Sequence, residues 1–333
     1  MLILSLILAC AEPVGSGTDE ADTDTDSDSD TDTDTDTDTD TDTDTDTDAD
    51  ADPATSYSLA ALLGTPGSGD GQLSEPRCLV FGPDDALWIA DTGNDRVQRW
   101  AGDGNFLSSF GGAGSDPGQL QTPKCLEITG DGTVWIADLD NHRIQSFDPD
   151  GTPRALFGEA GTGDGQLQNP YDVAVDSDGT VYVADYGNDR IQVFDDAGTW
   201  LATFGETGGA PGQFDAPSAI ELHDGQLWVA DTLNDRIQVL DTDGTPVGEV
   251  GVGVLDDPHQ FTWDGEGSLY VADQNHNLIR KLAPDGALLA SIGGPEAGQG
   301  ALWWPFGVAI DAAGVVYVGD MRNDRIVAFT PDE

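Results

Sequence analysis

An Asp and an Arg recur together along this sequence, at a spacing that suits either catalysis or structure. The Arg follows the Asp by five residues in the pattern D-x-x-N-x-R. The Asp residues are Asp91, Asp138, Asp185, Asp231, Asp273 and Asp320, and the Arg residues are Arg96, Arg143, Arg190, Arg236 and Arg325. They could form a ring of charged sites, or each carboxylate could accept hydrogen bonds from turn amides beside a charge-compensating Arg. Because one active site does not need so many copies, the repetition favours the structural role.

Residues that differ between the copies are better candidates for ligand binding. Each copy begins with a Pro, and the next residue reads Arg77, Lys124, Tyr171, Ser218, His259 and Phe306, a set called the mouth ring below. The residue after that reads Cys78, Cys125, Asp172, Ala219, Gln260 and Gly307, called the bridging ring. Both rings are heterogeneous, and they are partly cationic on an acidic protein. We therefore predict a ligand-binding channel mouth, and the alternative is ordinary variation in a solvent-filled mouth. The predicted ligand-binding residues are Arg77, Lys124, Tyr171, Asp172 and His259, with Trp303 and Trp304 as apolar walls.

The elements that position these residues follow from the repeat itself. The copies start at Pro76, Pro123, Pro170, Pro217, Pro258 and Pro305, spaced by 47, 47, 47, 41 and 47 residues. The third copy contains four β-prone runs, at residues 173–176, 181–185, 190–194 and 200–204, separated by turn-forming residues. Four such strands at this period form one blade of a β-propeller. The aromatic residue of each second strand is expected to pack between blades, and these are Trp88, Trp135, Tyr182, Trp228, Tyr270 and Tyr317.

The two ends of the repeat region predict how the ring closes. The sixth copy ends after its third strand, whereas residues 59–63, before the first copy, match the fourth strand at residues 107–110. An N-terminal strand that completes the last blade leaves no unpaired edge between the first and last blades. The sequence therefore predicts an all-β, six-bladed β-propeller over residues 58–333, and not two domains.

These motifs resemble the NHL repeat family of six-bladed, TolB-like propellers. The resemblance rests on the Pro that opens each copy, the apolar-aromatic-apolar-A-D strand, the N-x-R-I-Q run and the G-Q-L or G-Q-F before the next Pro. The fifth copy departs from the pattern, because His276 and Leu278 replace the Asn and the Arg. Blades of the WD and kelch types fit less well, since neither signature recurs.

The resemblance also implies which enzymatic functions to test. Peptidyl-hydroxyglycine amidating lyases hold zinc with three His, each directly after a blade-starting Pro, and here only His259 occupies such a position. The other His residues are placed in turns, at His142, His223 and His276. Lactonase-like propellers use several channel carboxylates and amides for Ca²⁺, and Asp172 alone does not make such a site. We therefore predict no catalytic residue, no metal site and no cofactor. A metal-assisted lyase or hydrolase with an active site in the channel is the alternative.

Cys78 and Cys125 occupy the same position in neighbouring blades, 47 residues apart. In an oxidising compartment they could form a disulfide between the first two blades. Alternatively, both are small buried residues without a bond, because bridging requires Cα atoms within about 7 Å.

The N-terminal residues suggest export and anchoring. Residues 1–10 resemble a signal peptide that ends at a lipobox-like Cys10, the expected lipidation site of a bacterial lipoprotein. Residues 11–57 are rich in alternating Asp and Thr, which predicts a disordered acidic linker because like charges repel. A calcium site in this linker and a cytoplasmic protein are the alternatives.

The net charge of the chain argues against nucleic acid as a partner. The chain carries 63 acidic and 12 basic residues, a net charge of −51, and 19 of the acids lie in residues 1–52. The remaining residues keep 44 acids and all 12 bases, a net of −32. Such a surface repels nucleic acid, whose binding depends on Lys and Arg. We therefore expect a monomeric, non-enzymatic module of the cell envelope, or a secreted one, which binds a protein, peptide or glycan and meets the membrane only through its lipid anchor.

Overall fold

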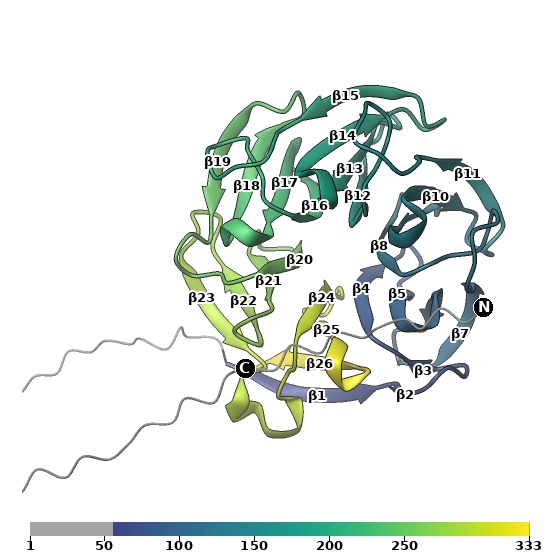
Figure 1. The fold of residues 1–333 in the computed structure, drawn as a ribbon. Coiled ribbons are helices and arrows are strands. Elements are labelled where there is room, and N and C mark those ends of the chain that lie inside the picture. Colours follow the sequence, from purple (N-terminus) through teal and green to yellow (C-terminus); the bar gives the residue numbers. More distant parts are fainter. Residues whose placement is uncertain (1–55, 333) are drawn as a thin grey trace, which may run out of the picture. The chain divides into compact units, whose positions relative to one another are not determined.

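The computed structural model describes residues 56–332. Six four-stranded antiparallel sheets form a closed ring around a central channel (Figure 1). The predicted signal-like segment, Cys10 and most of the acidic linker lie outside the described residues. The described helices are short 3₁₀ segments, and none of them is long and apolar enough to cross a membrane.

Five blades each consist of four consecutive strands, ordered from the channel outward. Blade one contains β4 (Pro76–Phe81), β5 (Leu87–Asp91), β6 (Arg96–Trp100) and β7 (Phe106–Gly111). Blade two contains β8 (Pro123–Ile128), β9 (Val134–Asp138), β10 (Arg143–Phe147) and β11 (Pro153–Phe157). Blade three contains β12 (Asp172–Val175), β13 (Val181–Asp185), β14 (Arg190–Phe194) and β15 (Trp200–Phe204). Blade four contains β16 (Pro217–His223), β17 (Gln226–Asp231), β18 (Arg236–Asp241) and β19 (Pro246–Val250). Blade five contains β20 (Pro258–Trp263), β21 (Leu269–Asp273), β22 (Leu278–Leu282) and β23 (Leu288–Ile292).

The sixth blade combines the two ends of the described chain. It contains β24 (Pro305–Ile310), β25 (Val316–Asp320), β26 (Arg325–Pro331) and, as its outer strand, β1 (Tyr57–Leu63). Strand β1 pairs antiparallel with β26, from Tyr57 opposite Pro331 to Leu63 opposite Ile326. The predicted closure by an N-terminal strand is therefore confirmed.

Short elements connect the strands. A two-stranded parallel pair, β2 (Thr65–Pro66) and β3 (Gln72–Leu73), precedes the first blade. Single 3₁₀ turns mostly follow the second strand of a blade, and the 3₁₀ segments are η1 (Thr92–Asn94), η2 (Leu139–Asn141), η3 (Tyr186–Asn188), η4 (Thr232–Asn234), η5 (Pro295–Gly300) and η6 (Met321–Asn323).

The core lies between neighbouring blades. Trp88 of blade one is 2% exposed and belongs to one buried cluster with Leu126, Ile136 and Phe147 of blade two. Trp135 of blade two belongs in the same way to a cluster with residues of blade three. The prediction that the second-strand aromatic residues pack between blades is confirmed at these positions.

The repeated Asp organises the loop that leads into each inner strand. In blade three, the fully buried Asp185 accepts hydrogen bonds from the backbone amide of Gln168 (2.6 Å), from Asn188 (2.9 Å) and from Arg190 Nε (2.7 Å). The same guanidinium donates to the carbonyl oxygens of Thr162, Gly163 and Gln166 in the loop. The Asp and Arg therefore have the structural role that their repetition predicted.

Blade five keeps the hydrogen-bond network around its repeated Asp, although His276 and Leu278 replace the Asn and the Arg of the other copies. His276 Nδ1 lies 2.9 Å from the carboxylate of Asp273, where other blades place an Asn. Arg280 Nε donates to the same carboxylate at 2.7 Å, from the strand position that holds Gln in the first four blades. The charge compensation lost at Leu278 is thus supplied two residues later, where the side chain again faces the loop.

We predict that Asp185→Ala lowers the free energy of unfolding by about 3–5 kcal/mol, because it leaves the Arg190 guanidinium partly buried without its carboxylate. Chemical denaturation of the full chain measures this change. Asp164→Ala removes an exposed Asp of the neighbouring loop, and we expect it to stay within about 0.5 kcal/mol of the unmodified protein. Equal losses in the two variants would contradict the structural role of Asp185.

Candidate ligand-binding mouth and channel

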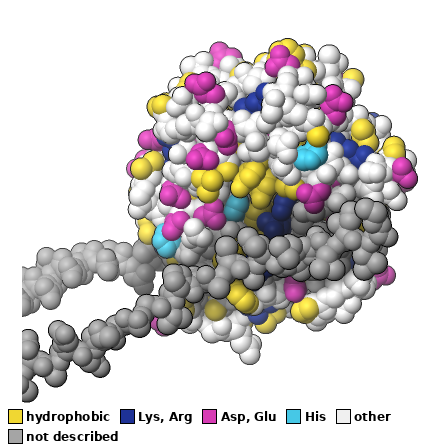
Figure 2. Space-filling model, viewed as in Figure 1, with side chains coloured by type: hydrophobic (Ala, Val, Ile, Leu, Met, Phe, Trp, Pro, Cys, Tyr) yellow, Lys and Arg dark blue, Asp and Glu magenta, His cyan; other side chains and the backbone are white. Residues whose placement is uncertain are grey.

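The mouth-ring side chains meet at one end of the channel. The ring centroids of His259 and Phe306 are 4.2 Å apart. The ring centroid of Tyr171 lies 6.4 Å from that of His259 and 6.2 Å from that of Phe306. Phe306 is 1% exposed and His259 is 6% exposed, so the rings fill the mouth and do not line a wide opening. Figure 2 shows hydrophobic side chains near the centre of the visible face, next to basic and His side chains.

Two cations rest on this aromatic group. The Arg77 guanidinium carbon lies 4.9 Å from the ring centre of Phe306, and Lys124 Nζ lies 5.1 Å from that of Tyr171, so both make cation–π contacts. Lys124 is only 6% exposed, and burial, reinforced by repulsion from Arg77, lowers the pKa of its amine to about 7. Arg77 lies 3.5 Å from Glu75, yet its buried Nε has no hydrogen-bond partner among the described residues.

His259 contributes to the mouth as a neutral aromatic ring. Burial and the nearby Arg77 lower the pKa of His259 to about 3, so the imidazole is uncharged at neutral pH. Its Nδ1 lies 3.0 Å from Ser218 Oγ, which in turn lies 2.5 Å from Thr232 Oγ1. This chain of contacts holds the imidazole in place beside Phe306.

The predicted walls Trp303 and Trp304 lie on the loop before β24, directly ahead of Pro305 and Phe306. They are 55% and 38% exposed, and Trp304 contacts the Arg322 guanidinium at 4.6 Å. Tyr186, at the start of η3, stacks on Tyr171 with ring centroids 4.1 Å apart. Sequence reasoning missed Tyr186, although it is the only aromatic residue directly after a repeated Asp.

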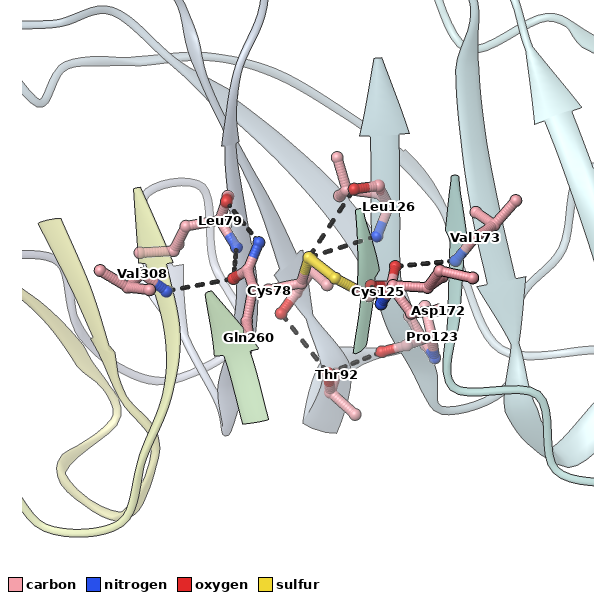
Figure 3. Close-up of a disulfide and its surroundings, with 12 residues drawn as sticks. Cys78, Leu79, Thr92, Pro123, Cys125, Leu126, Asp172, Val173, Gln260 and Val308 are labelled. Carbon is pink, nitrogen blue, oxygen red and sulfur yellow. Dashed lines mark hydrogen bonds between the residues drawn. A yellow bond between two sulfur atoms is a disulfide. The ribbon is translucent and has the colours of Figure 1, made fainter. Parts of the chain in front are cut away.

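The bridging ring ties neighbouring blades together beneath the mouth. Cys78 of β4 and Cys125 of β8 are joined by a disulfide, with Cα atoms 4.8 Å apart (Figure 3). The carboxylate of Asp172, one of the predicted ligand-binding residues, accepts hydrogen bonds from the amides of Val173 (2.8 Å) and of Ile220 in blade four (2.9 Å). This side chain therefore joins two blades in the channel wall.

Gln260 performs a similar bridging role on the other side of the channel. Its Oε1 accepts hydrogen bonds from the amides of Leu79 (3.0 Å) and Val308 (3.1 Å), and its amide nitrogen donates to the Leu79 carbonyl oxygen, as Figure 3 shows. At Gly307 a Cβ atom would lie 1.9 Å from the carbonyl oxygen of Arg77. Blades one and six approach closely there, so a larger residue does not fit.

Below the bridging ring, the inner strands enclose a cavity of about 210 Å³. Three carboxyl groups line it, from Glu127, Asp172 and Glu221. Burial raises the pKa of Glu127 to about 7, and burial together with repulsion from Glu127 and Asp172 raises the pKa of Glu221 well above its usual range. Within residues 56–332, no three His, Cys, Asp or Glu side chains are grouped so as to hold a metal ion.

Sequence reasoning missed Glu127 and Glu221. Both lie four residues after a blade-starting Pro, where other copies have Val80, Ala174, Thr262 or Ala309. The other copies have small or apolar residues at this inner-strand position. The acidic residues at this position in two copies could therefore have identified Glu127 and Glu221 from the sequence.

We predict that Glu127→Gln stabilises the protein at pH 8 but not at pH 4. The native-state pKa of Glu127 lies above its unfolded value, so the native state binds the extra proton and loses stability as the pH rises from about 4.5 to 7. The variant lacks this loss, and its free energy of unfolding should exceed that of the unmodified protein by on the order of 2 kcal/mol at pH 8. Urea denaturation at both pH values measures the difference, with the exposed Glu266→Gln as the control. A gain of equal size at both pH values would contradict the interpretation.

Comparisons with known proteins agree with this fold. Residues 167–194 match the family model of the NHL repeat, whereas a comparison with curated proteins found no match. A streptogramin B lyase structure is similar, with 16% identity, a TM-score of 0.60 and coverage of 83% of this chain and 98% of that chain. A catalytically inactive virginiamycin B lyase from Staphylococcus aureus with quinupristin has 16% identity, a TM-score of 0.59 and coverage of 83% and 99%. An auxiliary nutrient binding protein from Bacteroides ovatus has 16% identity, a TM-score of 0.63 and coverage of 84% and 78%. The chain is therefore a six-bladed β-propeller in which residues 167–194 match the NHL repeat.

Proposed function

We propose that this protein is a binding module of the cell envelope, whose protein, peptide or glycan ligand docks at the channel mouth. The docking surface consists of the mouth ring together with Tyr186. It combines two cations with aromatic rings at the centre of a rigid ring of blades. Such a surface offers both apolar contact area and charge for recognition.

Lys124 is the observation that carries this proposal. The five repeat Arg side chains each have a buried Asp carboxylate at 2.6–2.8 Å. Lys124 is as buried as these Arg residues, yet within the described part of the chain it has no carboxylate at ion-pair distance. Burying a charge without a partner costs free energy, and such groups cluster at functional sites. A ligand that supplies the missing partner would account for this residue.

The envelope location is supported by the sequence. The apolar run before Cys10 and the acidic stretch after it suit a lipid-anchored protein held away from a membrane by a hydrated linker. A propeller of similar fold is a nutrient binding protein of Bacteroides ovatus, which supports a binding role for the fold.

We predict that the full chain binds members of a synthetic peptide or glycan array through the mouth. Tyr186→Ala removes the partly buried stacking partner of Tyr171 and should weaken such binding at least about tenfold, since aromatic anchors dominate binding surfaces. Trp200→Ala removes a more exposed aromatic residue from the outer strand β15 and should leave the affinity unchanged. Titration of purified ligands by calorimetry gives the affinities.

Two results would overturn the proposal. One is the absence of any array ligand whose binding depends on Tyr186. The other is binding that is lost in Trp200→Ala and retained in Tyr186→Ala, which would place the ligand on the outer strands.

A further inference from the structure

The chemistry of the mouth also indicates which ligand group it recognises, an inference that rests on the proposed function. We propose that Arg77 and Lys124 together bind the carboxylate at the C-terminal end of a peptide. The peptide residue that carries this carboxylate would pack on the stacked pair of Tyr171 and Tyr186.

The backbone holds the two cations together. Arg77 directly precedes Cys78 on β4 and Lys124 directly precedes Cys125 on β8, and the disulfide fixes the Cα atoms of the two Cys residues 4.8 Å apart. Both cations rest on one aromatic group, Arg77 on Phe306 and Lys124 on Tyr171. Since the two like charges repel each other, an anion bound between them would relieve that repulsion.

Both cations have hydrogen-bond donors for which the described residues supply no acceptor. The Nε of Arg77 is buried without a partner in the described residues, and among those residues the Lys124 ammonium donates no hydrogen bond. Lys124 is itself more than nine-tenths buried, and its ammonium nitrogen, unlike Arg77 Nε, is not among the fully buried atoms without a partner, so a ligand at the mouth can reach it. A carboxylate presents two oxygens and about four lone pairs, which suits one guanidinium and one ammonium.

The surrounding charges favour a ligand with a single negative charge. Glu75 and Asp140 lie close enough to Lys124 to affect its titration, and Asp257 acts in the same way on Tyr171 and Tyr186. Together with the net charge of −32 over residues 53–333, these carboxylates repel a polyanion such as a uronic acid polymer. A peptide C-terminus brings one carboxylate on an otherwise neutral chain. The groups around Lys124 that could titrate are Arg77 on β4, Glu75 before it, Asp140 on η2, Tyr171 before β12 and His259 on β20.

The sequence offers a direct test because it contains only two lysines, Lys124 and Lys281. Lys281 lies 3.2 Å from Asp264, away from the mouth ring, and serves as an internal control. The full chain is labelled with ¹³C-lysine, and the two side-chain signals are titrated with pH by NMR. The probes are N-acetyl-alanyl-alanyl-phenylalanine as the free acid, the same peptide as its C-terminal amide, and glucuronate.

We predict that the free-acid peptide raises the pKa of Lys124 by about one pH unit or more and leaves that of Lys281 unchanged, because a carboxylate favours the charged amine. The amide should leave both signals unchanged. Arg77→Met should weaken binding of the free acid at least about tenfold, whereas Arg154→Met, which alters a half-exposed Arg on β11, should not.

Three outcomes would overturn the inference. The first is no shift of the Lys124 signal at millimolar free acid, and the second is an equal shift with the amide. The third is a larger shift with glucuronate than with the peptide, which would assign the carboxylate to a sugar. An array ligand that binds through Tyr186 but is insensitive to C-terminal amidation would overturn this inference alone and leave the proposed function standing.

Discussion

A buried carboxylate at the end of each second strand is the interaction on which the rest of the structure depends. Asp185 shows why, because it accepts hydrogen bonds from a loop amide, from Asn188 and from Arg190 at once. The Arg then reaches the carbonyl oxygens of the same loop. These bonds fix the path of the chain into the inner strand, and hence the point at which each blade delivers its residues to the channel. The carboxylate also neutralises the Arg, so the repeat cations are already paired within their own blades.

Once the inner strands are held in place, position along the strand decides what each side chain does. Strand β8 shows this: after its Pro, the first residue, Lys124, lies at the mouth, the second, Cys125, forms the disulfide, and the fourth, Glu127, lines the cavity. Burial lowers the pKa of Lys124 and raises that of Glu127, both to about 7. The channel therefore disfavours charge of either sign, as expected where solvation is poor.

The two ends of the channel consequently differ in what they can recognise. The mouth has two cations that rest on aromatic rings, and it has hydrogen-bond donors without an acceptor among the described residues. The cavity has carboxyl groups of raised pKa and a wall of inner strands. A ligand that supplies an anion has its complement only at the mouth, which is why the proposals above concern that end.

The sequence alone determined the number of blades, the strands within them and the closure by an N-terminal strand, because turn residues, strand periodicity and the repeat are local signals. It also indicated that the repeated Asp and Arg serve structure. Only the tertiary structure decided that Asp172 joins two blades, that Tyr186 stacks on Tyr171, and that Arg280 replaces the Arg missing from the fifth copy. It likewise placed Cys78 within bonding distance of Cys125, a choice that the sequence left open. The contacts of Asp172 and of Cys78 join residues of different blades, and their geometry is set by the packing of strands around the ring, a property that no single copy of the repeat contains. The contacts of Tyr186 and Arg280 lie within one blade but join positions that the repeat pattern does not align.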